Sequence, residues 1–209
     1  MNFFQTVSPL IQTISLLLAF LLALTVHEFF HAYFADQFGD PTARHMGRLT
    51  LNPIAHLDLF GTLLPIFLIL TRSPFVFGWG KPVIVNPNNF KKPKIDNITV
   101  SLAGPMSNFG LAVIAGLVIR FAPLPPALEY FFATVMVINL VFMVFNLIPI
   151  PPLDGSKILS LFISESAYLL LQQFGIFLLL MLILFVNFTP AILKIVSFFV
   201  LLISGKTII

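Results

Sequence analysis

The chain has 209 residues, of which 58% are hydrophobic and only 9% are charged, and its mean hydropathy is +1.03. An ordinary soluble domain has about 25% charged residues, so this composition excludes a soluble globule and a disordered chain and predicts an integral membrane protein. The absence of cysteine excludes disulfides, thiolate metal ligands and cysteine nucleophiles. The net charge of +3 comes mostly from loop Lys and Arg residues, which fits a membrane topology better than nucleic-acid binding.

Long apolar segments separated by short polar ones predict a single membrane-embedded domain over residues 1–209. Residues 8–35 are long enough to cross a bilayer and lack the basic start and cleavage site of a signal peptide, so we expect a retained helix. Later segments predict two core helices and two closing helices, at 97–121, 128–149, 167–187 and 190–205. The expected fold is an all-α polytopic membrane protein, a bundle of about five to six transmembrane helices.

The region 36–96 predicts a cytoplasmic loop, a re-entrant segment and a small β-hairpin. Residues 59–71 are apolar, but as a helix their 13 residues reach only about 20 Å, whereas the bilayer core is about 30 Å thick. We therefore expect this segment to enter the membrane and return on the same side. Residues 75–90 combine β-branched and aromatic residues with Gly and Pro, a texture typical of a hairpin.

The first apolar segment contains an HExxH pattern, in the stretch Val26-His27-Glu28-Phe29-Phe30-His31. On a helix, residues four apart share a face, so both imidazoles can reach one metal ion, and Glu28 lies beside them. Zinc binds imidazole nitrogen and activates water, and a carboxylate at this place can act as general base. Ordinary polar helix residues are the alternative, but three titratable side chains at membrane depth are costly unless they are paired or bind a metal.

A hydrolytic zinc needs a third protein ligand beside an open position, and the sequence offers several candidates. Asp154 lies in the Pro-rich stretch 150–165, where neighbouring prolines prevent a regular helix before the short helix expected after it. Its carboxylate can bind the metal or cap that short helix, and the residues alone leave both roles open. The other candidates are His45, His56, Glu129 and Glu165, of which we expect the two histidines to form hydrogen bonds within loops.

Three motifs in this order resemble those of the site-2 protease family, whose members are intramembrane zinc metalloproteases. They are HExxH at His27–His31, Ala-Gly-Pro-x-x-Asn at Ala103–Asn108, and Asn-x-x-Pro-x-Pro-Pro-Leu-Asp-Gly at Asn146–Gly155. The resemblance extends over residues 20–160, including Gly47–Pro53 and Gly78–Val83. The chain is similar to a short form of the family, without the PDZ or CBS domain of larger members.

The resemblance implies the zinc site and the reaction. One zinc ion per chain would be bound by His27, His31 and Asp154, and Glu28 would be the catalytic general base. The implied reaction is endopeptidase cleavage of transmembrane segments by metal-activated water, as in regulated intramembrane proteolysis. The implied partners are a transmembrane protein substrate and the lipid bilayer, with no nucleic acid, while the sequence does not indicate an oligomeric state.

Two asparagines complete the resemblance. Asn108 and Asn146 match family asparagines near the active site that hold the substrate backbone or support an oxyanion. Hydrogen bonding between helices, which polar residues in membrane helices commonly provide, is the alternative for both.

The distribution of charge predicts the orientation in the membrane. If 59–71 is re-entrant, the end of the first helix and Asp154 lie on one side, as a shared metal site requires. That side would hold nine of the 11 Lys and Arg residues, which places it in the cytoplasm. We therefore expect a multi-pass protein of the cytoplasmic membrane, with the amino terminus outside and with the carboxyl terminus and the active-site opening on the cytoplasmic side.

Two further functions stay open on the sequence alone. Intramembrane His, Glu and Asp residues with broken helices also mark ion pathways, so an ion or metal transporter is the main alternative, although no inverted repeat is apparent. The second alternative is a family relative that binds membrane segments without cleaving them, although every expected catalytic residue is present.

Overall fold

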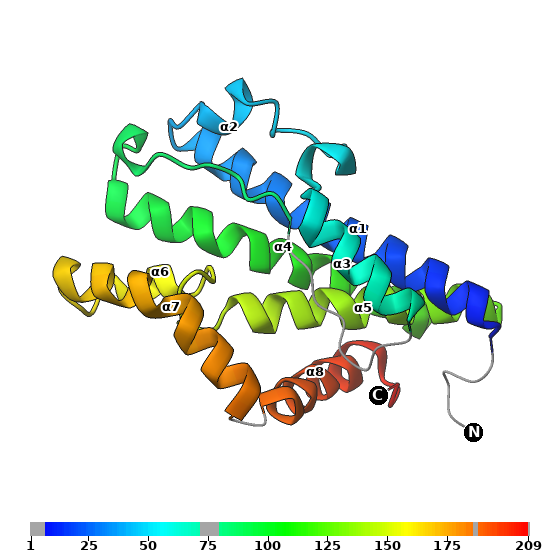
Figure 1. The fold of residues 1–209 in the computed structure, drawn as a ribbon. Helices are drawn as coiled ribbons and strands as arrows, with labels where there is room; N and C mark the ends of the chain where they lie inside the picture. The colour runs from blue at the N-terminus through cyan, green and yellow to red at the C-terminus, as the bar shows by residue number, and fades with distance from the viewer. Residues whose placement is uncertain (1–6, 72–79, 186–187, 209) are drawn as a thin grey trace.

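The computed structural model describes residues 7–71, 80–185 and 188–208. Its helices in chain order are α1 (Pro9–Gln37), α2 (Thr42–His45), η2 (Pro53–His56), α3 (Leu59–Leu70), η3 (Pro87–Asn89), α4 (Pro93–Phe121), α5 (Pro126–Asn146), α6 (Ser156–Leu159), α7 (Glu165–Phe185) and α8 (Phe188–Ser204). Figure 1 shows α1, α4 and α5 side by side at the centre, with α7 and α8 along one flank. The helical fold class is therefore confirmed.

The three central helices begin in the same way. Each has a proline in its first turn, at Pro9, Pro93 and Pro126. A proline is tolerated there because the first amide groups of a helix have no intrahelical partner and the fixed φ of proline suits the helix. For α1, Ser8 adds a cap, because its side chain accepts a hydrogen bond from the Ile11 N–H.

Small residues let the central helices approach closely. Ala19 of α1, Ala112 of α4 and Ala133 of α5 are all fully buried in one apolar cluster. At Gly116 of α4, a Cβ atom would lie 2.5 Å from the Ile203 side chain of α8 and 2.8 Å from Met136 Sδ of α5. Glycine at this position therefore brings α8 against the α4–α5 pair, the type of close contact that supports helix association in a bilayer.

Within the described residues, four helices are long and apolar enough to cross a membrane: α1, α4, α5 and the Glu165–Leu182 part of α7. α8 is apolar but shorter, so the expected count of five to six spans is not established. α3 is an apolar helix of 12 residues, too short for a span, as expected. The chain that follows it includes residues 72–79, outside the described residues, so its re-entrant path stays a prediction.

The expected β-hairpin over 75–90 is not seen. Residues 75–79 lie outside the described residues, and from residue 80 onward the chain has one isolated bridge, between Gly80 and Leu57, followed by an extended segment without a paired strand. Pro82 and Pro87 offer a physical reason, because each removes an N–H donor that a strand ladder would need.

The carboxyl terminus lies at the end of the bundle opposite to the one predicted. Lys206 Nζ contacts Glu129 Oε1 at 2.6 Å in the first turn of α5, and Arg120 at the end of α4 donates to the carbonyl of Leu202. In Figure 1 the described chain therefore starts and ends at the same side of the bundle. The prediction assumed that α7 and α8 each cross the bundle, whereas together they carry the chain across it once.

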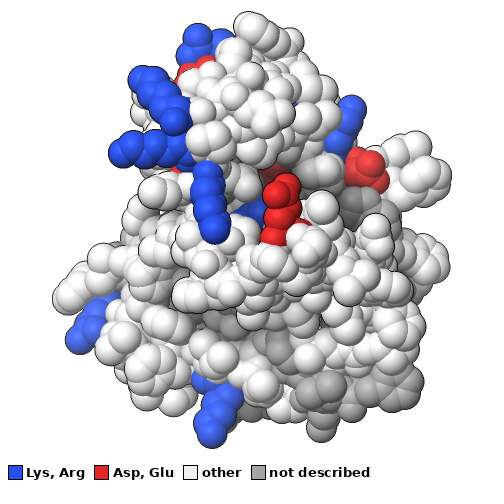
Figure 2. Space-filling view, turned by 90° about the vertical axis from the view of Figure 1, so that its left-hand side faces the viewer, with Lys and Arg blue, Asp and Glu red and all other residues white. Residues whose placement is uncertain are grey.

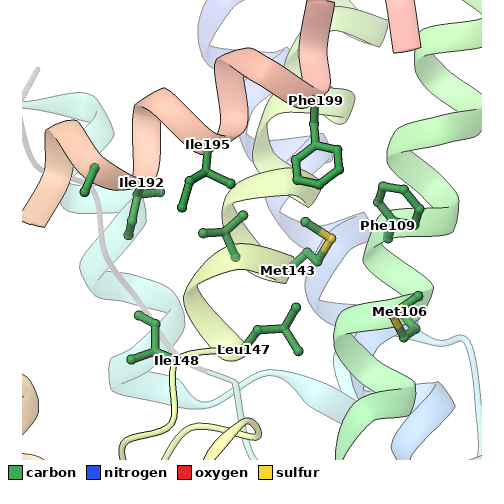
Figure 3. Close-up of a pocket in the computed structure, with 10 residues that line it drawn as sticks. Met106, Phe109, Met143, Leu147, Ile148, Ile192, Ile195 and Phe199 are labelled. Atoms are coloured by element: carbon green, nitrogen blue, oxygen red, sulfur yellow. The ribbon is translucent and has the colours of Figure 1, made fainter. Parts of the chain in front are cut away.

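An apolar cavity of about 490 Å³ lies between part of α8 and the α4–α5 pair. Figure 3 shows side chains from all three helices around it, including Phe109, Met143, Leu147, Ile192 and Phe199. None of its lining residues offers a charged group or an imidazole. The cavity therefore holds none of the candidate metal ligands, which meet elsewhere in the bundle.

Candidate metal centre

The two histidines of the HExxH pattern lie one turn apart on α1 and face the interior of the bundle. His27 is 4% and His31 is 8% exposed, and their Nε2 atoms are 2.9 Å apart. Asp154 approaches from the loop after α5, with its Oδ2 3.1 Å from His27 Nε2 and 3.3 Å from His31 Nε2. The structure thus brings Asp154 to two histidines that lie more than 120 residues earlier in the sequence.

Hydrogen bonds behind the rings define their protonation. His31 Nδ1 lies 2.8 Å from the Val100 carbonyl, which can only accept, so this nitrogen carries the proton. His27 Nδ1 lies 2.7 Å from Asn108 Oδ1, while Asn108 Nδ2 donates to the Ala23 carbonyl and to Asn139 Oδ1. With its amide nitrogen used in this way, Asn108 offers His27 an acceptor. In their neutral form both imidazoles would therefore present Nε2 lone pairs to the centre, the arrangement that outer-shell partners impose on metal-binding histidines.

The three converging atoms fit a divalent cation. Two imidazole nitrogens and a carboxylate oxygen, all acceptors in these protonation states, lie 2.9–3.3 Å from one another. Asp154 Oδ2 is buried and has no hydrogen-bond donor in the described residues. Such a cluster is repulsive unless a metal ion or a shared proton lies among the three atoms, and the ligand atoms of a tetrahedral zinc lie about 3.3 Å apart, close to the distances seen here. The donor set of nitrogen and oxygen atoms suits zinc.

Glycine at position 104 makes room for this cluster. A Cβ atom on Gly104 would lie 2.7 Å from both His27 Cε1 and His31 Cε1, and it would also meet His31 Nε2. The Ala-Gly-Pro motif therefore allows the α4 backbone to pass directly beside the imidazoles. Glycine often allows close packing of membrane helices, and at Gly104 this packing brings α4 into contact with the candidate ligands of α1.

The loop from Asn146 to Gly155 folds back and returns Asp154 to α1. The Gly155 N–H donates to the Asn146 carbonyl at 2.7 Å, and a Cβ on Gly155 would overlap the Leu147 and Ile148 carbonyls. The alternative role of Asp154 as a helix cap is not seen, because α6 begins at Ser156 without a side-chain cap. Its carboxylate instead points to the two histidines.

Glu28 is half-buried and lies next to the cluster in sequence. Its Oε2 accepts a hydrogen bond from the Val83 N–H at 2.9 Å, so the extended segment after residue 80 touches the expected general base. This contact involves a backbone amide, which no side-chain pattern in the sequence could reveal.

The two asparagines lie in different surroundings. Asn108 is fully buried, and its amide group contacts His27 Nδ1, the Ala23 carbonyl and Asn139 Oδ1, so its implied contact with substrate stays a prediction. Asn146 is half-buried, and its side chain donates to the Phe142 carbonyl at 3.1 Å. Asn139, fully buried on α5, is a site residue that the sequence analysis missed. The sequence could have indicated Asn139, because an amide side chain in the middle of an apolar helix is costly without a hydrogen-bond partner.

The other candidate ligands lie elsewhere. His56 is fully buried and its Nε2 contacts the Thr50 carbonyl at 2.8 Å, while Glu129 pairs with Lys206. Among the described residues, His27, His31 and Asp154 form the one group of three metal-binding side chains that converge.

The fold and this site are those of a multi-pass membrane protein whose HExxH histidines form a buried candidate metal centre with Asp154. A model of peptidase family M50 matches residues 122–186. A Bacillus subtilis protein named "Putative zinc metalloprotease YwhC" is 44% identical over 154 residues, which cover 69% of this chain and 67% of that protein. Proteins named "Putative zinc metalloprotease Rip2" from Mycolicibacterium smegmatis and Mycobacterium tuberculosis are 33% identical; the match covers 72% of this chain and 59% of theirs. No solved structure matches the chain.

The chain belongs to peptidase family M50, the site-2 protease family, and is a metalloendopeptidase.

Proposed function

We propose that the chain is a zinc-dependent intramembrane endopeptidase that cleaves transmembrane segments of other membrane proteins. The observation that supports it best is the convergence of two imidazole Nε2 atoms and a buried Asp154 oxygen inside a bundle of membrane-spanning length. His27, His31 and Asp154 would bind one zinc ion per chain. When bound, zinc supplies a Lewis acid for the scissile carbonyl and makes water a stronger nucleophile near neutral pH.

Glu28 has the role of general base. Its carboxylate takes the proton of the attacking water and returns it to the leaving amine, as HExxH geometry allows. Val83 donates to Oε2 and leaves Oε1 for this proton. Asn108 and the Val100 carbonyl hold the imidazoles in the tautomer that keeps both Nε2 atoms available for metal.

The extended segment from Lys81 to Asn86 is our candidate for holding the substrate. A transmembrane helix hides its carbonyls in internal hydrogen bonds, so it must be unwound before cleavage, and an unwound segment can add to an exposed backbone edge. Val83 of this segment contacts Glu28, while the neighbouring Ile84 is 54% exposed. Substrate added beside Ile84 would therefore lie close to the catalytic carboxylate. Asn146, half-buried at the end of α5 where the loop with Asp154 begins, stays our candidate for contact with substrate.

We place the chain in the cytoplasmic membrane with the metal centre nearer the cytoplasmic end. Figure 2 looks onto the end of the bundle where α4 begins, and Lys and Arg side chains gather there. Exposed basic residues at this end include Arg44, Lys91, Lys92 and Lys94. The positive-inside rule places such an end in the cytoplasm, and moving Lys206 to the other end does not reverse the asymmetry.

Zinc content and cleavage of a single-span substrate, measured on purified protein, test this proposal. We expect one zinc per chain in the wild type and in Glu28→Gln, with cleavage lost in Glu28→Gln. Asp154→Ala should bind zinc at least tenfold more weakly, since one of three protein ligands is removed. An active Glu28→Gln variant would refute the assigned mechanism. Zinc-dependent ion flux without cleavage would instead support a transporter, which no observation in the described residues favours.

A further inference from the structure

The segment Lys81–Asn86, called the strap below, crosses the molecule from η2 to η3 and is hydrogen-bonded to other elements at three points. Its backbone amides donate to the His56 carbonyl at 2.9 Å, to Glu28 Oε2 at 2.9 Å and to Asp40 Oδ2 at 2.7 Å, from Lys81, Val83 and Asn86 respectively. Figure 1 shows this stretch passing along α1 and α4 before α4 begins. The strap therefore has a fixed place beside the catalytic end of α1.

Asp40 forms the anchor at the far end of the strap. It is fully buried just after α1, and its Oδ1 accepts from Thr42 Oγ1 at 2.5 Å and from Asn89 Nδ2 at 2.7 Å. Its Oδ2 accepts from the Asn86 N–H. Burial raises the pKa of this carboxyl, but hydrogen bonds from Thr42, Asn86 and Asn89 outweigh burial and lower the pKa below its ordinary value. Only a carboxylate satisfies donors on both oxygens, because an amide would present an N–H to one of them.

The inner face of the strap packs against the part of α4 that contacts His31. Val85 lies against an apolar cluster that contains Ala35, Phe90 and Val100. The carbonyl of Val100 is the partner of His31 Nδ1. The outer face is open, with Ile84 largely exposed. The strap is thus held by its two ends and by this cluster, without a paired strand in the described residues.

We propose that Asp40 is a positioning residue for proteolysis: by anchoring Asn86 and Asn89 it holds the strap so that the Val83 N–H fixes the Glu28 carboxylate. The inference rests on the proposed function, because Glu28 must act as general base for its orientation to affect the rate. The Glu28 side chain has several rotatable bonds, and the Val83 amide is the partner that selects one carboxylate position. Loss of the anchor releases this amide, and misplacement of a catalytic group lowers the rate of the chemical step.

The test uses three variants of the full chain and one matched control. Asp40→Asn turns one acceptor into a donor, and Asn89→Asp places a second carboxylate beside Asp40. The double variant Asp40→Asn with Asn89→Asp restores one donor–acceptor pair with the roles exchanged. Asp36→Asn is the control, because Asp36 lies one turn earlier and pairs with Arg44 instead of the strap. Each protein is measured for zinc content, for kcat and KM with a single-span substrate, and for amide hydrogen exchange over residues 81–86.

We expect both single variants to keep zinc, to lose about tenfold or more in kcat, and to keep KM within about twofold. Their amide exchange over 81–86 should accelerate, and the double variant should regain about threefold in kcat. The control should match the wild type in all three measurements.

Faster exchange over 81–86 with an unchanged kcat would overturn the proposal, and so would wild-type exchange in both single variants. Loss of zinc from both would also overturn it, because Asp40 would then support the whole fold. A wild type that binds zinc but cleaves nothing would refute the proposed function; the exchange measurement would still decide whether Asp40 holds the strap.

Discussion

Replacing Gly104 with alanine tests the geometry of the metal centre most directly. The added Cβ would lie 2.7 Å from His27 Cε1 and from His31 Cε1, about 0.7 Å inside the shortest ordinary contact of 3.4 Å. Neither ring can retreat freely, because their Nδ1 atoms are held by Asn108 and the Val100 carbonyl. Zinc sites tolerate ligand displacements of about 0.2 Å, so a shift several times larger should weaken zinc binding by about 10- to 100-fold.

Gly110→Ala is the matched control on the same helix. A Cβ on Gly110 meets no atom within 4 Å, and alanine is favoured over glycine in a helix by about 1 kcal/mol. The control should therefore bind zinc as the wild type does and be equally or slightly more stable. Zinc affinity is measured by competition with a chelator, and folding by thermal unfolding in detergent. A Gly104→Ala protein that is folded, binds zinc with wild-type affinity and cleaves normally would refute this geometry.

Three further predictions follow from the described contacts. Asn108→Ala removes the acceptor behind His27 and the donor to Asn139 Oδ1. Zinc affinity should therefore fall about 10- to 100-fold in the same competition assay, and unchanged affinity would contradict the tautomer assignment. Because the pKa of Asp40 is lowered by folding, its contribution to stability should be complete above its unfolded pKa of about 3.9 and be lost as pH falls through the lower folded pKa. Thermal unfolding of wild type and Asp40→Asn against pH checks this, and equal acid dependence of the two would argue against it. Single cysteines at Lys206 and Lys92 should react with a membrane-impermeant thiol reagent from opposite sides of the bilayer, and labelling from one side would contradict the placement of the carboxyl terminus.

The candidate metal ligands could be predicted from the sequence more completely than the membrane topology. Helical spacing alone places His27 and His31 on one face. The high cost of isolated titratable side chains at membrane depth indicated that the two bind one metal ion. The approach of Asp154 needed the resemblance to a known family, because no local rule links residues so far apart. In the structure Asp154 lies beside the histidines and does not cap α6, which supports the proposed role as a ligand.

The remaining features depend on contacts that a one-dimensional pattern does not contain. The hydrogen bonds from Val83 to Glu28 and from His31 to Val100 use backbone atoms, which every residue carries. The predicted hairpin is not seen in the described residues, where Pro82 and Pro87 remove donors that a paired strand would need. The carboxyl terminus was assigned by counting two crossings for α7 and α8, and only the contact of Lys206 with Glu129 showed otherwise.

The amide chain that joins Ala23, Asn108 and Asn139 has a consequence for the biogenesis of the enzyme. It ties α1, α4 and α5 together at the level of His27, and Asp154 follows α5 in the chain. During synthesis the HExxH helix therefore enters the bilayer long before its third ligand and its outer hydrogen bonds exist. If these three residues bind the metal as proposed, the site would be complete only after α5 and the loop with Asp154 have been added, and a chain that ends before them would lack the third ligand.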